Sequence, residues 1–147
     1  MQPGWHEMTI ADLRKLCVDS FPSSTTRVYI VTGLEFVVGK LISSKLSVDI
    51  WVNDSFLTSK INPEDSDIVL RIQVDVYNGW TEEQRSVIDW MANDDLKTPY
   101  HCHSFVFYEY PESHPLWAIG EYDRAYWTRQ FGFSRGNNYK GIAVIKI

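Results

Sequence analysis

A chain of 147 residues, of which 44% are apolar and 22% charged, has the size and composition of one folded domain, which excludes a disordered or low-complexity protein. The opening residues, among them Trp5, His6 and Glu7, are too polar for a secretory signal, and no apolar run reaches the length of a membrane span. The net charge of −5 gives no strong nucleic-acid signal, and we expect a single cytoplasmic domain over residues 1–147.

The spacing of apolar residues predicts four helices and four strands. Thr9 resembles the N-cap of the first helix, because Asp12 follows three residues later, and Thr81 is a good start for a later helix. The two strands in the middle of the chain are expected to be neighbours. In chain order, the predicted elements are a helix over 10–17, a helix over 25–44, strands over 48–52 and 68–74, a helix over 81–93, a strand over 104–108, a helix over 122–131 and a strand over 141–147.

This order lacks the regular alternation of strand and helix, so we expect an α+β fold in which helices pack on a mixed β-sheet. Cys17 and Cys102 do not form a CxxC pair and should be reduced and buried. Charge is unevenly distributed, since residues 49–95 carry eleven acidic side chains against three basic ones, whereas residues 120–147 carry five basic ones against two acidic. Such polarity suits a metal–phosphate site or an acidic face for a basic partner.

Two carboxylates introduce the predicted strand over 68–74. Asp65 and Asp67 are two residues apart at the start of this strand, so their side chains should point to the same side. Oxygen ligands placed in this way can bind Mg²⁺ together with the phosphates of a nucleotide, and such ions assist phosphoryl transfer. The alternative role for acidic residues next to Pro63 is local hydrogen bonding within a turn.

A turn that ends at Ser55, ten residues before Asp65-Ser66-Asp67, resembles the nucleotidyltransferase signature of Gly-Ser followed by Asp-x-Asp. Further blocks look like a small bacterial and phage family of nucleotidyltransferase-like proteins, which is known only as a domain of unknown function. These blocks are Phe21-Pro22-x-Ser24-x-x-Arg27, the segment from Trp51 through Lys60 to Asp67, Tyr126-Trp127-x-x-x-Phe131-Gly132-x-x-Arg135 and Lys140-Gly141-Ile142. The resemblance spans nearly the whole chain. It implies a minimal nucleotidyltransferase-like fold with a nucleotide and divalent-metal site.

By this resemblance, Asp65 and Asp67 are the candidate catalytic and metal-binding residues, and Ser55 and Lys60 the candidate nucleotide contacts. The first hypothesis is therefore an enzyme that uses Mg²⁺ or Mn²⁺ to transfer a nucleotidyl group from a nucleoside triphosphate to a hydroxyl of a protein or RNA. A domain that binds nucleotides without turnover is a further possibility at the same site.

Two residues depart from the family pattern. Asp54 stands where the pattern has glycine, and it adds a Cβ and a negative charge where the backbone should approach phosphates. His103 occupies the place of the third carboxylate and is the third candidate catalytic residue, because an imidazole accepts protons but is a poor ligand for Mg²⁺. Both departures count against the usual two-metal route.

Other hypotheses stay open. The acidic middle of the chain could serve as a binding face for a basic protein partner, as an immunity protein or antitoxin blocks a toxin. His101-x-His103, with His114 nearby, offers a competing zinc site. Cations near the end of the chain are further candidates to hold phosphate, although surface cations without a role are at least as common: Arg124, Arg129, Arg135 and Lys140.

Overall fold

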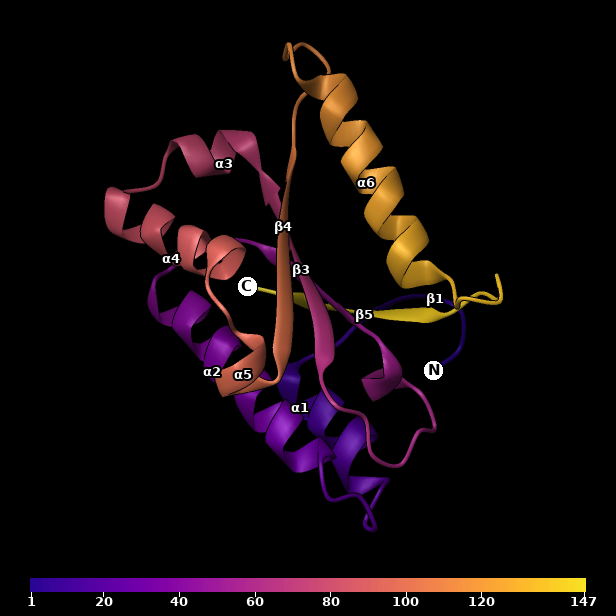
Figure 1. Ribbon diagram of the computed structural model, residues 1–147. Coiled ribbons are helices and arrows are strands. Elements are labelled where there is room, and N and C mark those ends of the chain that lie inside the picture. Colours follow the sequence, from indigo (N-terminus) through magenta and orange to yellow (C-terminus); the bar gives the residue numbers. More distant parts are fainter.

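Five strands form one mixed sheet with helices on both faces in the computed structural model, which describes residues 1–147 (Figure 1). The expected α+β class is therefore confirmed. The strands are β1 (Gly4–Glu7), β2 (Asp49–Asn53), β3 (Ser66–Gln73), β4 (Cys102–Glu109) and β5 (Gly141–Lys146). The helices are α1 (Ile10–Arg14), α2 (Arg27–Ser43), α3 (Val74–Asn78), α4 (Glu82–Asn93), α5 (Lys97–Tyr100) and α6 (Trp117–Gly132), with a π-helical turn η1 (Lys15–Asp19) and a 3-10 turn η2 (Ser55–Leu57). None of the helices combines the length and the apolar character needed to cross a membrane.

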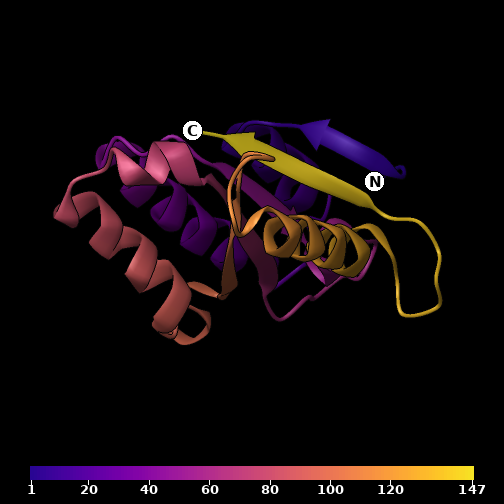
Figure 2. The same cartoon turned by 90° about the horizontal axis from the view of Figure 1, so that it is seen from above.

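The strands are arranged in the order β1-β5-β2-β3-β4, so β5, the last strand along the chain, lies inside the sheet. β2 runs antiparallel to both of its neighbours, whereas the outer pairs β1–β5 and β3–β4 are parallel. Figure 2 shows β1 and β5 side by side along one border of the molecule. The β2–β3 pairing confirms that the strands predicted over 48–52 and 68–74 are neighbours.

Each face of the sheet has its own apolar core, because successive side chains of a strand point to opposite faces. The larger core lies between the sheet and the helices α2 and α4, and it includes Cys17 and Cys102, which are buried as expected. The smaller core lies under α6 on the other face (Figure 1). Its buried members are Trp51, Val69, Phe107, Phe131, Ile142 and Val144.

Local signals predict the longer elements well and the shorter ones poorly. Thr9 and Thr81 form the capping boxes, since each hydroxyl accepts a hydrogen bond from the backbone N–H three residues later. α6 begins at Trp117, ahead of the predicted start at 122, and no side chain caps it. β1, α3 and α5 are absent from the predicted elements because none exceeds five residues, which is too short to show a period. Val74, predicted to end a strand, instead begins α3.

A glycine inside α2 allows the close packing of two helices. Gly33 interrupts the apolar pattern of the predicted helix over 25–44, yet α2 continues through it. A Cβ atom at this position would lie 1.8 Å from the carbonyl oxygen of Tyr100, so no larger residue fits while α5 stays in place. The glycine therefore brings α5, and Lys97 at its start, against the side of α2.

A buried arginine organises the loop between β2 and β3. Arg27, the first residue of α2, has no exposed surface, and its guanidinium donates hydrogen bonds of 2.7–3.3 Å to five backbone carbonyl oxygens. The ring of Phe21 stacks on the guanidinium with its centroid 3.7 Å from the central carbon. The five carbonyls belong to Cys17, Phe56, Thr58, Lys60 and Ile61. The loop from 56 to 61 is thus folded around one side chain.

Arg27→Lys should strongly destabilise the fold, because an ammonium group cannot reproduce the planar fork and several buried carbonyls lose their donor. We expect the free energy of unfolding, measured by urea titration, to fall by at least about 3 kcal/mol. Arg14→Lys is the matched control, since Arg14 pairs with Glu35 at the partly exposed surface and should cost less than about 1 kcal/mol. Equal losses in the two variants would contradict this role of Arg27.

Candidate functional site

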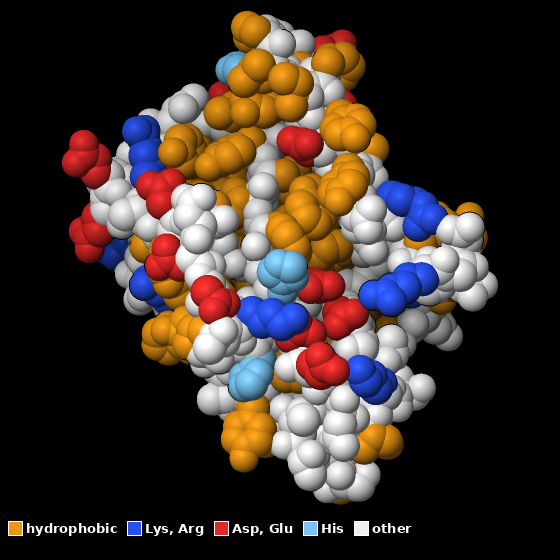
Figure 3. All heavy atoms as spheres, in the orientation of Figure 1, with side chains coloured by type: hydrophobic (Ala, Val, Ile, Leu, Met, Phe, Trp, Pro, Cys, Tyr) orange, Lys and Arg blue, Asp and Glu red, His pale blue; other side chains and the backbone are white.

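An acidic corner lies where β2 ends and β3 and β4 begin, on the face of the sheet that α6 covers. Asp67, near the start of β3, pairs in register with Asn53 of β2 and with His103 of β4. Its Oδ1 atom lies 3.5 Å from Nδ1 of His103. Three strands therefore meet at this carboxylate, and Figure 3 shows acidic side chains gathered beside a histidine near the centre of the view, with cations to either side.

Asp65, the other half of the Asp-x-Asp pair, is engaged by a lysine. Its Oδ2 atom accepts a bond of 2.7 Å from Nζ of Lys97, and its side chain is only 13% exposed. Asp65 does not line the cavity that Asp67 faces. The two carboxylates are nevertheless close enough for the charge of Asp65 to raise the pKa of Asp67. The two carboxylates thus influence each other through their charges, but each has a different neighbour: Lys97 for Asp65 and His103 for Asp67.

Asp54 holds a backbone conformation that favours glycine. Its φ of 84° and ψ of −166° lie in a region that residues with a Cβ rarely adopt. The signature to which the sequence was compared has glycine at this position, and the backbone here has a conformation typical of glycine although the side chain is aspartate. The Asp54 carboxylate accepts a hydrogen bond of 3.0 Å from the hydroxyl of Ser55, which orients it.

A cavity of about 600 Å³ opens between the acidic corner and α6. Asn53 closes one end of it, because its buried side-chain amide donates to the carbonyl of Phe131 and so joins the end of β2 to the end of α6. The lining combines carboxylates, cations and aromatic rings, among them Asp54, Asp67, Arg135, Lys140, Phe105 and Trp127. The acidic middle and the basic tail of the sequence thus face each other across one cavity.

Charges in this cavity are only partly compensated. Burial, followed by the charges of Asp54 and Asp65, raises the pKa of the Asp67 carboxyl. Burial lowers the pKa of Lys140, while Asp54 and Asp67 act in the opposite direction. Neither Lys140 nor Arg135 forms an ion pair within the chain. An anionic ligand beside these cations, or a cation beside the carboxylates, would neutralise the charges that have no partner within the chain.

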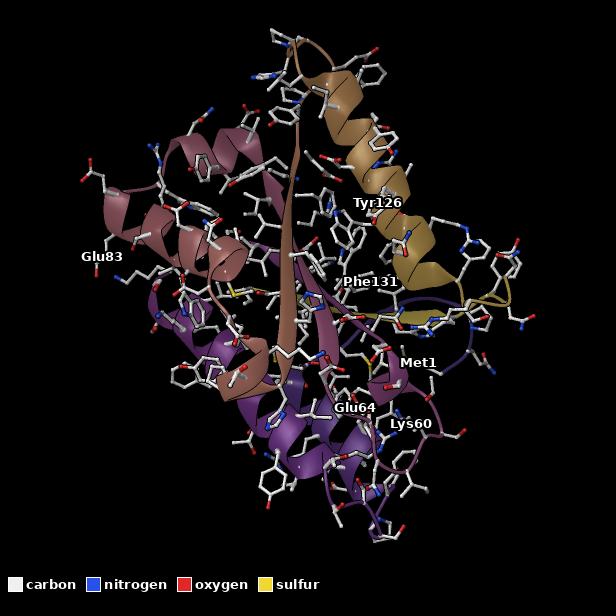
Figure 4. The ribbon with its side chains drawn as sticks, viewed as in Figure 1. Met1, Lys60, Glu64, Glu83, Tyr126 and Phe131 are labelled. Carbon is white, nitrogen blue, oxygen red and sulfur yellow. The ribbon has the colours of Figure 1, made fainter.

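The nucleotide contacts predicted at Ser55 and Lys60 lie outside the cavity lining. Lys60 is exposed on the loop after η2, well apart from Tyr126 and Phe131 of α6 (Figure 4). Its backbone is fixed, since its carbonyl accepts from Arg27 and its N–H donates to the hydroxyl of Thr58. Lys140, one of the cations considered from the basic tail, takes the place at the cavity instead. Asn53 and Phe105 are site residues that the sequence did not single out, since each resembles an ordinary strand residue until its neighbours are known.

The histidines do not form the alternative zinc site. His101 ends α5 with a φ of 53°, whereas His103 faces Asp67. His114 lies beyond the far end of β4, where its ring accepts a hydrogen bond from the N–H of Leu116. Along the whole described chain, no group of three or more His, Cys, Asp or Glu side chains is placed to hold a metal ion.

A divalent cation fits the acidic corner only in company with phosphate groups. Mg²⁺ is commonly held by one or two carboxylates together with substrate phosphates, without a cage made wholly of protein. Asp54 and Asp67 both line the cavity, and the charge of one raises the pKa of the other, which a cation would relieve. These two residues, more than Asp65, are therefore the side chains that would hold such an ion.

The family model described as "family of unknown function (DUF6932)" matches residues 1–146 of the chain. The chain belongs to this family. No curated protein and no solved structure matches it. For this DUF6932 protein, the relationship to nucleotidyltransferases therefore stays a prediction from the sequence blocks quoted above.

Asp54→Gly should stabilise this DUF6932 chain, because glycine adopts the observed backbone angles without strain. We expect the free energy of unfolding to rise by about 1 kcal/mol in urea titrations. Asp54→Ala separates strain from charge, since it removes the carboxylate but keeps the Cβ, and it should not reproduce the gain. A destabilised glycine variant would show that the bond from Ser55 to Asp54 outweighs the strain.

Asp67→Asn should also stabilise the protein near neutral pH. The folded-state pKa of Asp67 is raised above its ordinary value of 3.8, so the folded state loses stability as pH rises through that window and Asp67 ionises. The advantage of the variant in urea titrations should therefore be larger at about pH 7 than at about pH 4, and it should stay below about 1 kcal/mol because the carboxylate is partly exposed to solvent. Both proteins carry His103→Gln, which removes the neighbouring titration; an advantage that shrinks with rising pH would contradict the sign.

Proposed function

We propose that the protein binds a nucleoside triphosphate with a divalent cation in the cavity at Asp67 and transfers its nucleotidyl group to a hydroxyl of a protein or RNA. The observation that supports this proposal best is the pairing of half-buried carboxylates on one wall with the unpaired cations Lys140 and Arg135 on the other. Carboxylates suit a metal ion and cations suit phosphate oxygens. The proposal includes a cytoplasmic location, where nucleoside triphosphates are available.

In this proposal, each side chain has a separate task. Lys140 and Arg135 bind phosphate oxygens and hold the triphosphate in the cavity. The cation, held by Asp54 and Asp67 when bound, supplies electrostatic stabilisation of the phosphates. Asn53 keeps β2 and α6 together and so maintains the width of the cavity.

In this proposal, His103 accepts the proton of the attacking hydroxyl. Its Nδ1 faces Asp67, which orients the ring and leaves Nε2 for this role. The hydroxyl oxygen then bonds to the α-phosphorus, the bond to the pyrophosphate oxygen breaks with its electron pair, and the proton passes to Nε2. A single histidine with an exposed edge thus replaces the third carboxylate of the usual arrangement.

Thermal unfolding with Mg²⁺ or Mn²⁺ and each of ATP, CTP, GTP and UTP tests the binding step, because a ligand of the native state raises the melting temperature. We expect a rise for the wild type that is lost in Asp67→Asn and Lys140→Gln. Glu83→Gln on α4 is the control for removing a carboxylate and should retain the rise, since Glu83 is not part of the lining and lies well apart from the lining residues Tyr126 and Phe131 in Figure 4. Lys60→Gln should also retain it, although the sequence pattern assigns the phosphate contact to Lys60.

Turnover is then measured as pyrophosphate release in the presence of RNA or protein hydroxyls. Binding without product would leave a nucleotide-sensing domain, and no binding to any nucleotide would exclude the proposal. His103→Gln should abolish product formation while it preserves the nucleotide-dependent rise in melting temperature, since the histidine acts on the acceptor.

The alternative function is that of an acidic binding protein, such as an immunity protein or antitoxin that blocks a toxin. A specific observation favours it: α4 and the turn after it expose acidic side chains that form no ion pair, namely Glu82, Glu83, Asp89, Asp94 and Asp95. Under this alternative, nucleotides leave the melting temperature unchanged. Charge reversal at Glu82, Glu83 and Asp89 would then weaken a complex with a basic partner, whereas Asp67→Asn would not.

A further inference from the structure

We infer that the aromatic part of the cavity lining, formed by Phe105, Tyr126 and Trp127, is a stacking site for the base of the nucleotide. This inference rests on the proposed function and adds the part of the ligand that carries no charge. The three rings come from β4 and α6, and all of them line the same cavity as Asp67 and Lys140. The proposed phosphate and metal binding use none of these three rings.

These rings form a connected surface that is open on one side. The centroids of Phe105 and Trp127 lie 4.7 Å apart, and those of Tyr126 and Trp127 lie 5.1 Å apart. Tyr126 is 45% exposed, although α6 could have carried a polar residue at this position. Aromatic side chains that border a cavity in this way offer flat apolar area to a planar ligand.

Trp127 also offers an unused hydrogen-bond donor. Only two buried side-chain polar atoms in the chain lack a partner, and neither belongs to Trp127. Since its indole N–H donates no hydrogen bond within the chain and is not one of these buried atoms, it keeps some contact with solvent, and Trp127 itself lines the cavity. A base presents ring nitrogens and carbonyl oxygens as acceptors along its edge, so the apolar surface and the donor suit the same ligand.

The aromatic surface continues directly into the charged end of the cavity. Phe105 follows His103 by two residues on the same face of β4, and the centroids of the two rings lie 4.3 Å apart. His103 lies beside Asp67 at the charged end. A nucleotide has a flat, uncharged base at one end and phosphates at the other, joined by a sugar. It would place its base at the aromatic rings and its phosphates at the charged end of the cavity.

The test compares the dissociation constants of a nucleoside triphosphate and of inorganic tripolyphosphate, both with Mg²⁺. Tyr126→Ala and Trp127→Leu should weaken nucleotide binding by about tenfold and leave tripolyphosphate binding unchanged, because only the base stacks. Lys140→Gln should weaken both ligands. Tyr122→Ala, one turn earlier on α6, 70% exposed and outside the lining, is the matched control and should change neither.

The outcomes distinguish the inference from the function on which it rests. Equal affinities for the two ligands, with no effect of Tyr126→Ala, would overturn the stacking site and leave the phosphate site in place. No binding of either ligand would overturn both. An equal loss from Tyr122→Ala would show that the effect belongs to the helix surface and would also overturn the stacking site. Tyr126→Ala removes no buried core contact, so it keeps the test valid should Trp127→Leu fail to fold.

Discussion

The geometry of the acidic corner depends on one buried guanidinium group. Arg27 belongs to α2, yet its five acceptors lie in η1, in η2 and in the loop after it. This loop separates Asp54 from Asp65, so its path sets how the two acidic positions lie relative to each other. Neutral carbonyls, not carboxylates, surround the buried charge, and five well-directed bonds offset its loss of water. Removing such a donor therefore disturbs the site as well as the core.

Several features of the cavity oppose stability. Asp54 adopts a strained φ, Asp67 holds a charge in a half-buried place near two other carboxylates, and Lys140 loses solvation. Strain and uncompensated charge of this kind concentrate at functional sites, where binding makes use of them. The ion pairs elsewhere in the chain are ordinary by comparison. Arg71, for example, forms ion pairs of 2.6 Å with both Asp49 and Glu109 on neighbouring strands, so each of these three side chains has a partner of opposite charge.

Much of the fold follows from local patterns, whereas the site depends on neighbours that no local pattern contains. The capping residues Thr9 and Thr81 and the apolar period of α2 are signals within a few residues of one another, and they predicted those helices correctly. The proximity of Asp65 and Asp67 also has a local cause. That Lys97 would pair with Asp65 depends instead on the packing of α5 against Gly33.

Lys60 illustrates the same limit in the site. Its position in a sequence block placed it near the phosphates, but Arg27 draws its carbonyl inward and its side chain stays outside the cavity. Lys140 arrives at the cavity through the turn that precedes β5, some 73 residues after Asp67 in the chain. Only the opposite signs of charge in the two segments indicated that they would meet, and charge sign specifies neither residue nor distance.

The strand order has a consequence for how the chain assembles. β1 pairs only with β5, so β1 lacks a partner in the sheet until β5 has emerged from the ribosome. Meanwhile α2, β2, β3 and β4 are already complete and can collapse around the larger core. Pairings between such distant segments form slowly, because the entropy of closing a long loop is lost before the contacts between the two strands form. The half of the cavity supplied by α6 and the turn before β5 is therefore absent until this part of the chain has been synthesised, so the cavity forms only when β5 joins the sheet.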